Sequence, residues 1–216
     1  MKKRGPHVKR KPYESMLRAE GAEQTRATIV AIARRLFVER GYDGTTMQAI
    51  ADQAGVALDT VYATVGKKPL LARLLVEAAL SNRDRAVPAE ERDYVIRIRA
   101  AASAREKLRI YAAAIAEIHG RLSPLFAALK AAAPSHPEIA ELWREITERR
   151  ARNMRLFASD LLATGEVRRG LDVKRVADVV WATNSSELYS LLVDERGWSS
   201  EEYRAWLLDA WERLLL

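Results

Sequence analysis

Apolar side chains recur along this chain with the period of an α-helix, and glycine and proline fall mainly between the periodic segments. Ile29, Ile32, Ala33, Leu36 and Phe37, for instance, are spaced so that they share one helix face. No segment alternates convincingly between apolar and polar residues as a half-buried strand does. The sequence therefore predicts an all-α protein.

Start and stop signals divide the periodic pattern into separate helices. We expect helices over residues 23–40, 45–54, 57–63, 69–85, 103–119, 124–133, 137–164, 172–191 and 199–216. The expected capping pairs are Thr45–Gln48, Ser103–Glu106 and Ser199–Glu202, with Asp172 as a further cap and with Pro69, Pro124 and Pro137 in first turns. Residues 86–92 are expected to form a linker.

Composition narrows the class of protein. The chain has no cysteine, and its three histidines stand far apart at positions 7, 119 and 136, so we expect no disulfide, no metal site and no bound cofactor. No apolar run approaches the roughly 20 residues that cross a bilayer. The basic start lacks the apolar stretch of a secretory signal. We expect a cytoplasmic protein with no membrane partner.

The net charge of +7 is concentrated near the N-terminus. Residues 1–86 hold 16 basic and 9 acidic side chains, whereas residues 87–216 hold 20 of each. Six basic residues and no acidic one fall in the first thirteen positions: Lys2, Lys3, Arg4, Lys9, Arg10 and Lys11. This asymmetry favours a basic arm that binds a polyanion, and the alternative is a disordered, solubilising tail.

Two short expected helices meet at Gly55, which is the pattern of a helix-turn-helix. Gly55 tolerates the backbone of a tight turn, and Ala51 leaves room for the second helix to approach the first. The second helix would present Leu58, Asp59 and Thr60, together with Tyr62 and Ala63, to a major groove. An ordinary helical hairpin would have the same spacing.

Several consecutive runs resemble the N-terminal domain of TetR/AcrR-family transcriptional regulators. They are Thr25-Arg26, the run from Ala33 to Tyr42, the run from Thr45 to Ala51, Ala54-Gly55-Val56 and Thr60-Val61-Tyr62. The resemblance implies a basic arm (residues 1–21), a three-helix helix-turn-helix domain (22–82, motif about 45–64) and a larger helical ligand-binding and dimerisation domain (83–216). It also implies a homodimer that binds a palindromic DNA operator as a repressor and is released by a small-molecule effector.

The resemblance assigns DNA contacts position by position. Thr45 or Thr46 matches the helix start that meets a phosphate, and anions at a helix N-terminus are favoured in any case. Thr60 and Tyr62 match the recognition-helix pair, and Lys68, aided by Lys67, matches a phosphate-binding lysine. Packing of the Tyr62 ring in the core, or simple solvation of the two lysines, would be the structural alternative.

The expected reading face departs from the family pattern at Ala57, Ala63, Val65 and Pro69. Its helix offers no Arg, Asn or Gln for bidentate recognition of a base, and Asp59 can accept only from a cytosine amino group. We therefore expect specificity to come from Thr60, from Ala57 or Leu58 against thymine methyl groups, from Gln48 and from the arm.

The C-terminal helices are the expected dimer interface. Their apolar stripes contain Val176, Val180, Leu191, Tyr203, Trp206, Leu207, Trp211 and Leu214, and large aromatic residues favour interface cores. The alternative is that these residues pack inside one subunit.

A ligand pocket is expected between the helices of the middle region. Candidate lining residues are polar or aromatic: Tyr111, His119, Trp143, Asn153, Trp181 and Asn184. Each could equally be an ordinary core or surface residue. Two other functions compete with a DNA-binding regulator, namely a protein-binding adaptor and an enzyme with a non-functional helix-turn-helix. The sequence contains none of the common catalytic motifs that would support an enzyme.

The arm hypothesis predicts a change in salt dependence. Each phosphate contact steepens the slope of log K against log salt by about 0.9, so a chain that lacks residues 1–13 should bind DNA with a shallower slope than the full chain. Titrations at several salt concentrations measure both slopes. Equal slopes would show that the arm makes no phosphate contacts.

Overall fold

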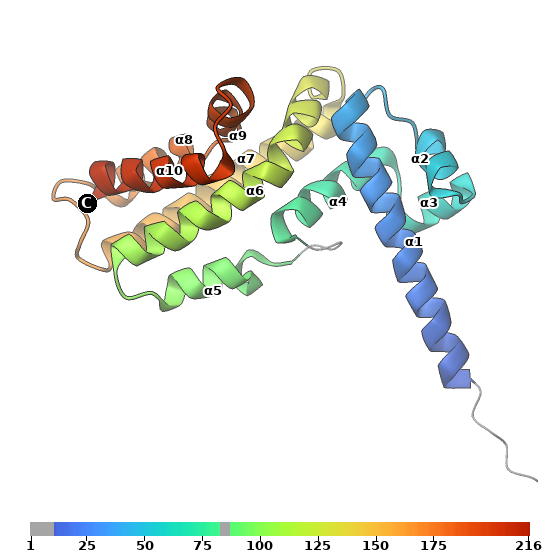
Figure 1. Cartoon of the computed structure of the whole chain (residues 1–216), viewed down its shortest axis with the longest axis horizontal. Coiled ribbons are helices and arrows are strands. Elements are labelled where there is room, and N and C mark those ends of the chain that lie inside the picture. The colour runs from blue at the N-terminus through green and yellow to red at the C-terminus, as the bar shows by residue number, and fades with distance from the viewer. Residues whose placement is uncertain (1–10, 83–86) are drawn as a thin grey trace, which may run out of the picture.

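The computed structural model describes residues 11–82 and 87–216, and for residues 11–18 it describes the backbone alone. These residues form helices joined by turns and contain no strand, which confirms the all-α prediction (Figure 1). The helices are α1 (Lys11–Arg40), α2 (Met47–Ala54), α3 (Leu58–Val65), α4 (Lys68–Ser81), α5 (Asp93–Ala100), α6 (Ala104–Ala132), α7 (Pro137–Leu162), α8 (Val173–Thr183), α9 (Ser186–Tyr189) and α10 (Ser200–Leu215). A 3-10 helix η1 (Ala89–Glu91) precedes α5, and a π-helix η2 (Ser190–Glu195) follows α9.

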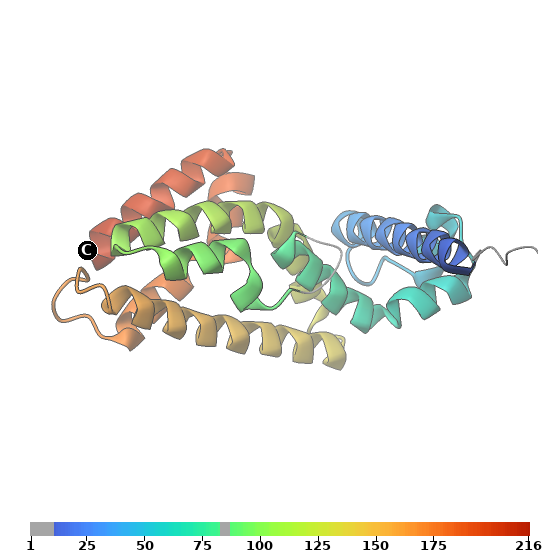
Figure 2. The same ribbon diagram turned by 90° about the horizontal axis from the view of Figure 1, so that it is seen from below.

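The chain is arranged in two parts joined by α4. Helices α1, α2 and α3 lie at one end of the molecule, and α5 to α10 form a longer bundle at the other end (Figures 1 and 2). Helix α4 packs against α1 and α3 on one side and against α6 and α7 on the other. One continuous apolar core therefore runs through both parts.

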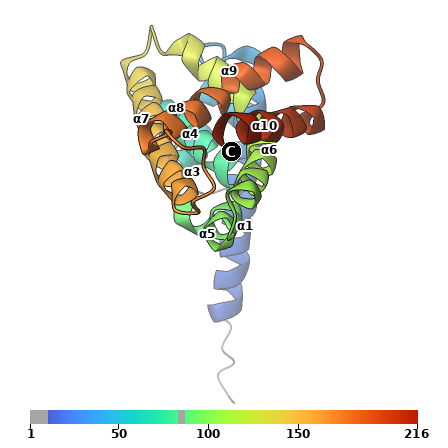
Figure 3. The same ribbon diagram turned by 90° about the vertical axis from the view of Figure 1, so that its left-hand side faces the viewer.

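The bundle is organised around the two longest helices of the C-terminal part. Helices α6 and α7 lie side by side, α8 packs on α7, and α5 and α10 pack on α6 (Figure 3). Trp211 and Tyr203 of α10 are fully buried at this centre. None of the helices in the described ranges combines the length and the apolar character needed to span a bilayer.

Helix α1 begins at Lys11, twelve residues before the predicted start at residue 23. Residues 11–22 contain one proline in the first turn, where its missing N–H costs little, and one glycine. The predicted boundary of the basic arm at residue 21 therefore falls inside a helix. Residues 1–10, which carry five of the six arm cations, lie outside the described residues.

Helix α6 is one 29-residue helix, so the predicted break between His119 and Ser123 is wrong. Pro124 lies inside the helix and leaves the carbonyl of Gly120 without its usual donor. The helix continues because Leu122, Leu125 and their neighbours are buried in the core, and this packing outweighs the local break.

The chain between 86 and 103 and the region after Asn184 also differ from the prediction. The expected linker contains η1, and it is followed by α5, which the sequence pattern missed. The helix capped by Asp172 ends at Thr183, not at Leu191, because the hydroxyl of Ser185 accepts the Leu188 N–H and starts α9. The expected caps Ser103 and Asp172 and the full capping box of Ser199 and Glu202 are confirmed.

Helix α1 provides a matched pair for testing the core. Leu36 is fully buried, whereas Val38, two residues further along the same helix, is 45% exposed. Leu36→Ala should lower the free energy of unfolding by about 2–5 kcal/mol, and Val38→Ala should change it by no more than about 0.5 kcal/mol. Urea unfolding followed by circular dichroism measures both. Equal effects of the two substitutions would contradict this packing of α1.

Candidate nucleic-acid interface and cavity

The turn between α2 and α3 is set by Gly55. Its backbone is left-handed, with φ of 66°, and the N–H groups of Gly55 and Val56 close the end of α2 on the carbonyls of Asp52 and Ala51. No atom lies within 4 Å of the place where a Cβ would be. Glycine is therefore favoured here by the backbone conformation and not by crowding.

One face of α3 packs against the rest of the domain, and the opposite face is accessible to solvent. Val61 and Val65 are buried, and the Arg26 guanidinium of α1 donates to the carbonyl of Thr64 at 2.7 Å. The residues predicted to face DNA are exposed or half-buried: Ala57, Asp59 and Tyr62 are exposed, and Leu58 and Thr60 are half-buried. The Tyr62 ring is 42% exposed, so the alternative of core packing does not account for it.

The two threonines before α2 have different environments. Thr46 is the cap, and its hydroxyl accepts the Ala49 N–H at 3.0 Å. Thr45 is fully buried, and its hydroxyl donates to the Gly41 carbonyl at 2.9 Å. The predicted capping box of Thr45 and Gln48 is therefore wrong, and the Thr45 side chain has no surface to offer a phosphate. Gln48 is exposed and donates to Asp52.

Both predicted phosphate-binding lysines lie at the start of α4. Lys67 is the exposed residue that precedes the helix, and Pro69 is in its first turn, as expected. The Lys68 ammonium lies 4.2 Å from the centre of the Tyr42 ring. Burial lowers the pKa of Lys68, and Asp43 acts in the opposite direction. Lys68 is thus a positioned cation, whereas Lys67 extends into solvent.

A polar contact that the sequence did not reveal joins this domain to the bundle. Asp43, in the turn before α2, is 2.5 Å from Nε2 of His136, the residue that precedes α7. The His136 ring also packs edge-on against Tyr42, with ring centres 5.0 Å apart. Burial raises the pKa of Tyr42 to about 12, with smaller effects of Glu138 and Asp43. Asp43 and His136 are 93 positions apart along the chain, so no local sequence pattern could pair them.

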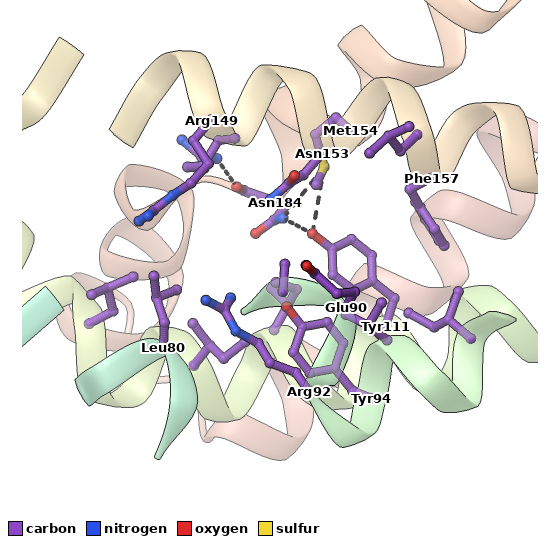
Figure 4. A pocket seen from close by; sticks show the side chains of 18 of the residues that line it. Leu80, Glu90, Arg92, Tyr94, Tyr111, Arg149, Asn153, Met154, Phe157 and Asn184 are labelled. Carbon is purple, nitrogen blue, oxygen red and sulfur yellow. Dashed lines mark hydrogen bonds between the residues drawn. The ribbon is translucent and has the colours of Figure 1, made fainter. Parts of the chain in front are cut away.

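The bundle contains a cavity of about 360 Å³ between α4, α5, α6 and α7 (Figure 4). Four of the six predicted ligand-binding residues line it: Tyr111, His119, Asn153 and Asn184. Trp143 and Trp181 do not, and their placement is a correction. Trp143 packs against Phe126, with ring centres 5.0 Å apart, and Trp181 is 37% exposed beneath the Arg150 guanidinium.

A buried hydrogen-bond network crosses the cavity wall. The Asn184 amide donates to the Tyr111 hydroxyl at 2.8 Å (Figure 4). The carbonyl oxygen of the same side chain is 2.9 Å from Nε2 of His119. His119 must then donate through Nε2, which leaves Nδ1 as a bare acceptor without a partner among the described residues. Burial lowers the pKa of His119 to about 4, against the opposite effect of the Asn184 hydrogen bond. The ring is therefore neutral at pH 7.

The cavity also contains charged residues that the prediction missed. Arg92, Arg99, Arg149 and Arg150 line it, together with Glu90 and Asp160. Among residues 11–82 and 87–216, no group of three His, Asp or Glu side chains is placed to hold a metal ion.

Most of the predicted dimer-interface residues are buried within this chain. Val176, Val180, Tyr203, Leu207 and Trp211 have no exposed surface, because α8 and α10 bury them against α7 and α6. These five cannot contribute surface to an interface, so the alternative of packing inside one subunit is correct for them. Leu191 and Leu214 are exposed by 48% and 47%, and Trp206 is half-buried.

The described chain thus consists of a helix-turn-helix domain joined through one helix to a larger helical bundle with a cavity. Residues 29–67 match the family model of bacterial regulatory proteins of the tetR family. The chain thus has the TetR-family helix-turn-helix domain within the fold of TetR-family transcriptional regulators, which confirms the resemblance. No curated protein matches the chain by sequence.

Solved structures share this fold over most of the chain. NalD of Pseudomonas aeruginosa, the secondary repressor of the MexAB-OprM multidrug efflux pump, is 19% identical, with 90% of this chain and 98% of that chain covered and a TM-score of 0.68. FadR of Bacillus subtilis in complex with stearoyl-CoA is 21% identical (86% and 96% covered, TM-score 0.66). A transcriptional regulator of Saccharomonospora viridis in complex with choline is 20% identical (89% and 98% covered, TM-score 0.66).

The depressed pKa of His119 predicts that stability depends on pH. Its value of about 4 lies below the unfolded value of 6.5, so the unfolded chain binds the proton first as the pH falls. Stability is therefore complete above about pH 6.5 and decreases toward pH 4. For this one group, the loss between pH 7.5 and pH 5 is about 2 kcal/mol.

Chemical unfolding at the two pH values measures this effect, with His119→Gln as the comparison. The variant should lose about 2 kcal/mol less than the wild-type chain between the two pH values. An identical pH dependence of both proteins would show that His119 is not the buried neutral group described here.

Proposed function

We propose that this protein is a DNA-binding transcriptional repressor that leaves its operator when a small molecule occupies the cavity of the bundle. The observation that carries the proposal is the exposed outer face of α3, held by a buried face in a domain that matches the tetR family model. A helix presented in this way can enter a major groove. The proposed division is an N-terminal arm, a DNA-binding domain over about residues 22–82 and an effector domain over 83–216.

The DNA-contacting residues are proposed to be those that remain accessible. They are Thr46 and Gln48 on α2, Ala57, Leu58, Asp59, Thr60 and Tyr62 at α3, and Lys67 and Lys68 at α4. The N–H groups at the start of α2 are available for a phosphate beside Thr46. Helix α3 has few side chains that can form hydrogen bonds to bases. Apolar contacts and the shape of the operator are therefore expected to contribute more to the specificity than such hydrogen bonds do.

A homodimer is part of the proposal, because two recognition helices must reach half-sites about 34–36 Å apart. The exposed apolar side chains Trp181, Leu191 and Leu214 lie on α8, η2 and α10. Contiguous exposed apolar side chains mark protein–protein contacts, and the proposed contact would bring these three side chains against those of a second copy. We place the dimer contact there, on the outer sides of helices whose inner sides form the core.

Effector binding is supported by the cavity. Its volume of about 360 Å³ is at the lower end of the range of about 300–1,000 Å³ for small-molecule sites. It borders the end of α4 at Leu80, and Lys67 and Lys68 lie at the start of the same helix, so an occupant can act on the DNA-binding part through one helix. Two proteins of the same fold were crystallised with choline and stearoyl-CoA.

The proposal predicts a gel shift with DNA from upstream of the protein's own gene, at low salt and with unrelated DNA as competitor. Lys67→Ala should weaken binding and reduce the slope of log K against log salt by about 0.9, because one phosphate contact is lost. The matched control is Lys174→Ala on α8, whose ammonium pairs with Asp178 far from the helix-turn-helix. This control should leave both affinity and slope unchanged.

The outcomes separate the competing functions. An adaptor or an enzyme with a non-functional helix-turn-helix would bind none of the duplexes specifically. Equal effects of Lys67→Ala and Lys174→Ala would mean that binding depends on net charge and not on the surface of α2, α3 and the start of α4.

A further inference from the structure

The lining of the cavity requires an occupant that is mainly apolar. Fourteen of its 23 lining residues are apolar or aromatic, among them Tyr94, Ile115, Met154 and Phe157. A polar molecule would lose its hydration there without enough partners to replace it. The apolar part of the ligand is small, the size of one alkyl chain of medium length or one or two rings, because the cavity measures about 360 Å³.

One carboxylate is shared by two arginines at the edge of this cavity. Oε1 of Glu77, on α4, is 2.7 Å from Nη1 of Arg149, and Oε2 is 3.8 Å from Nη2 of Arg92. The Glu77 side chain is only 15% exposed and that of Arg92 only 11%. Figure 4 shows Arg92 and Arg149 on the same side of the cavity, toward Leu80. The Arg149 side chain is 37% exposed, so one shielded and one partly exposed positive charge share a single negative charge.

Arg150 supplies a third lining guanidinium, and the nearest carboxylate that acts on its charge, Glu187, lies beyond ion-pair distance. Arg150 donates to the backbone carbonyls of Asn184 and Trp181 and lies over the Trp181 ring at 5.3 Å. Within the described part of the chain it forms no ion pair. Burial lowers the pKa of Arg150, which means that its charge is poorly solvated. A bound anion would relieve this cost.

The acidic lining residues do not offset these arginines. Asp160 is paired with the Lys107 ammonium at 2.9 Å, so its charge is already balanced. Glu90, on η1, is exposed, where water screens it. His119 is neutral and contributes no charge. The fourth lining arginine, Arg99, is exposed as well, so water screens its charge in the same way.

We propose that the cavity binds an amphiphilic anion, with its apolar body among the aromatic and aliphatic side chains and its carboxylate among Arg92, Arg149 and Arg150. The ligand's carboxylate and Glu77 then compete for Arg149 and Arg92. Glu77 belongs to α4, so binding removes the ion pairs that join α4 to α7 and to the start of α5. The regulatory consequence of this competition rests on the proposed function, whereas the ligand class does not.

Three probes of equal chain length test the ligand class. Decanoate, decanol and decyltrimethylammonium are titrated into the full chain at pH 7.5, below their micellar concentrations, by isothermal titration calorimetry. We expect one decanoate per chain, bound at least about tenfold more tightly than the other two, since hydrogen bonds to charged groups contribute that much. Equal or tighter binding of decanol or the cation, or no binding of decanoate, would overturn the proposal.

Variants locate the anion. Arg149→Gln and Arg150→Gln should each weaken decanoate binding about tenfold and leave decanol unchanged. The matched control is Arg152→Gln on the same helix, whose side chain is 60% exposed and lies 3.9 Å from Glu148. This control should bind decanoate like the wild-type chain. Equal losses in all three variants would indicate a general charge effect and contradict the site.

Glu77→Gln distinguishes competition from a purely structural ion pair. Removing the competing carboxylate should increase decanoate affinity several-fold, whereas a structural role predicts an unchanged or lower affinity. The same proteins are then tested for release of operator DNA. If decanoate binds with the expected charge selectivity and the operator stays bound, the ligand class stands and the proposed release mechanism fails.

Discussion

The apolar face of α4 belongs to both parts of the molecule, and this shared burial is the constraint on which the rest of the structure depends. Leu71, Ala72, Leu75, Val76 and Ala79 are all buried, and the helix packs against α1, α3, α6 and α7. Interiors are close-packed and have few alternative arrangements. A displacement of α4 in the bundle must therefore be matched by a displacement in the helix-turn-helix domain.

Polar contacts surround this shared core. They differ in how much they contribute to stability and in whether their partners line the cavity. Arg73 on α4 and Glu145 on α7 form an ion pair in which each side chain is more than 40% exposed. Such an exposed pair contributes little to the stability of the fold. The Arg34 guanidinium of α1 donates to the backbone carbonyl of Arg121 on α6, and the Arg121 guanidinium donates to the backbone carbonyl of Ala79 on α4. These hydrogen bonds join the two parts of the molecule, but neither arginine lines the cavity. Glu77 is the shielded contact of α4 whose partners also line the cavity.

The sequence predicted the N-terminal domain well because its signals are local. Gly55 is needed for a left-handed turn, and Pro69 suits a first turn. Val65, expected on the reading face, is instead buried. Local signals failed where packing decides. Pro124 is a valid helix start, yet its neighbours are buried and the helix passes through it. Thr45 and Thr46 are equivalent in sequence, and only the turn at Gly41 determines which one caps α2.

The prediction of the dimer interface in the C-terminal part failed for a different reason. An apolar stripe on a helix shows that the stripe is buried but not what buries it, so Trp211 and Tyr203 could not be assigned to core or interface from spacing. The orientation of the arginines near the cavity could not be predicted from the sequence for the same reason. Arg149 and Arg150 face the cavity, while Arg152, in the same run of charges, faces solvent. A helical charge run does not reveal this difference until the neighbouring helices are placed.

The energy available at Glu77 matches what regulation of this kind requires. Coupling between two sites in one protein is typically about 1–3 kcal/mol, or about 5- to 150-fold in affinity. A hydrogen bond to a charged group contributes about 1.5–3 kcal/mol, and the 37% exposure of the Arg149 side chain reduces this through solvent screening. In the proposed mechanism, exchange of one such bond between Glu77 and a ligand carboxylate therefore supplies a coupling energy near the lower end of the range above. The buried face of α4 carries the large side chains Leu71, Leu75 and Val76 beside Ala72 and Ala79, so α4 moves only together with the helices that it packs against, by the small shear of packed helices. In the proposed mechanism, the ion pair of Glu77 and Arg149 beside this face links the charge of a ligand to the position of α3.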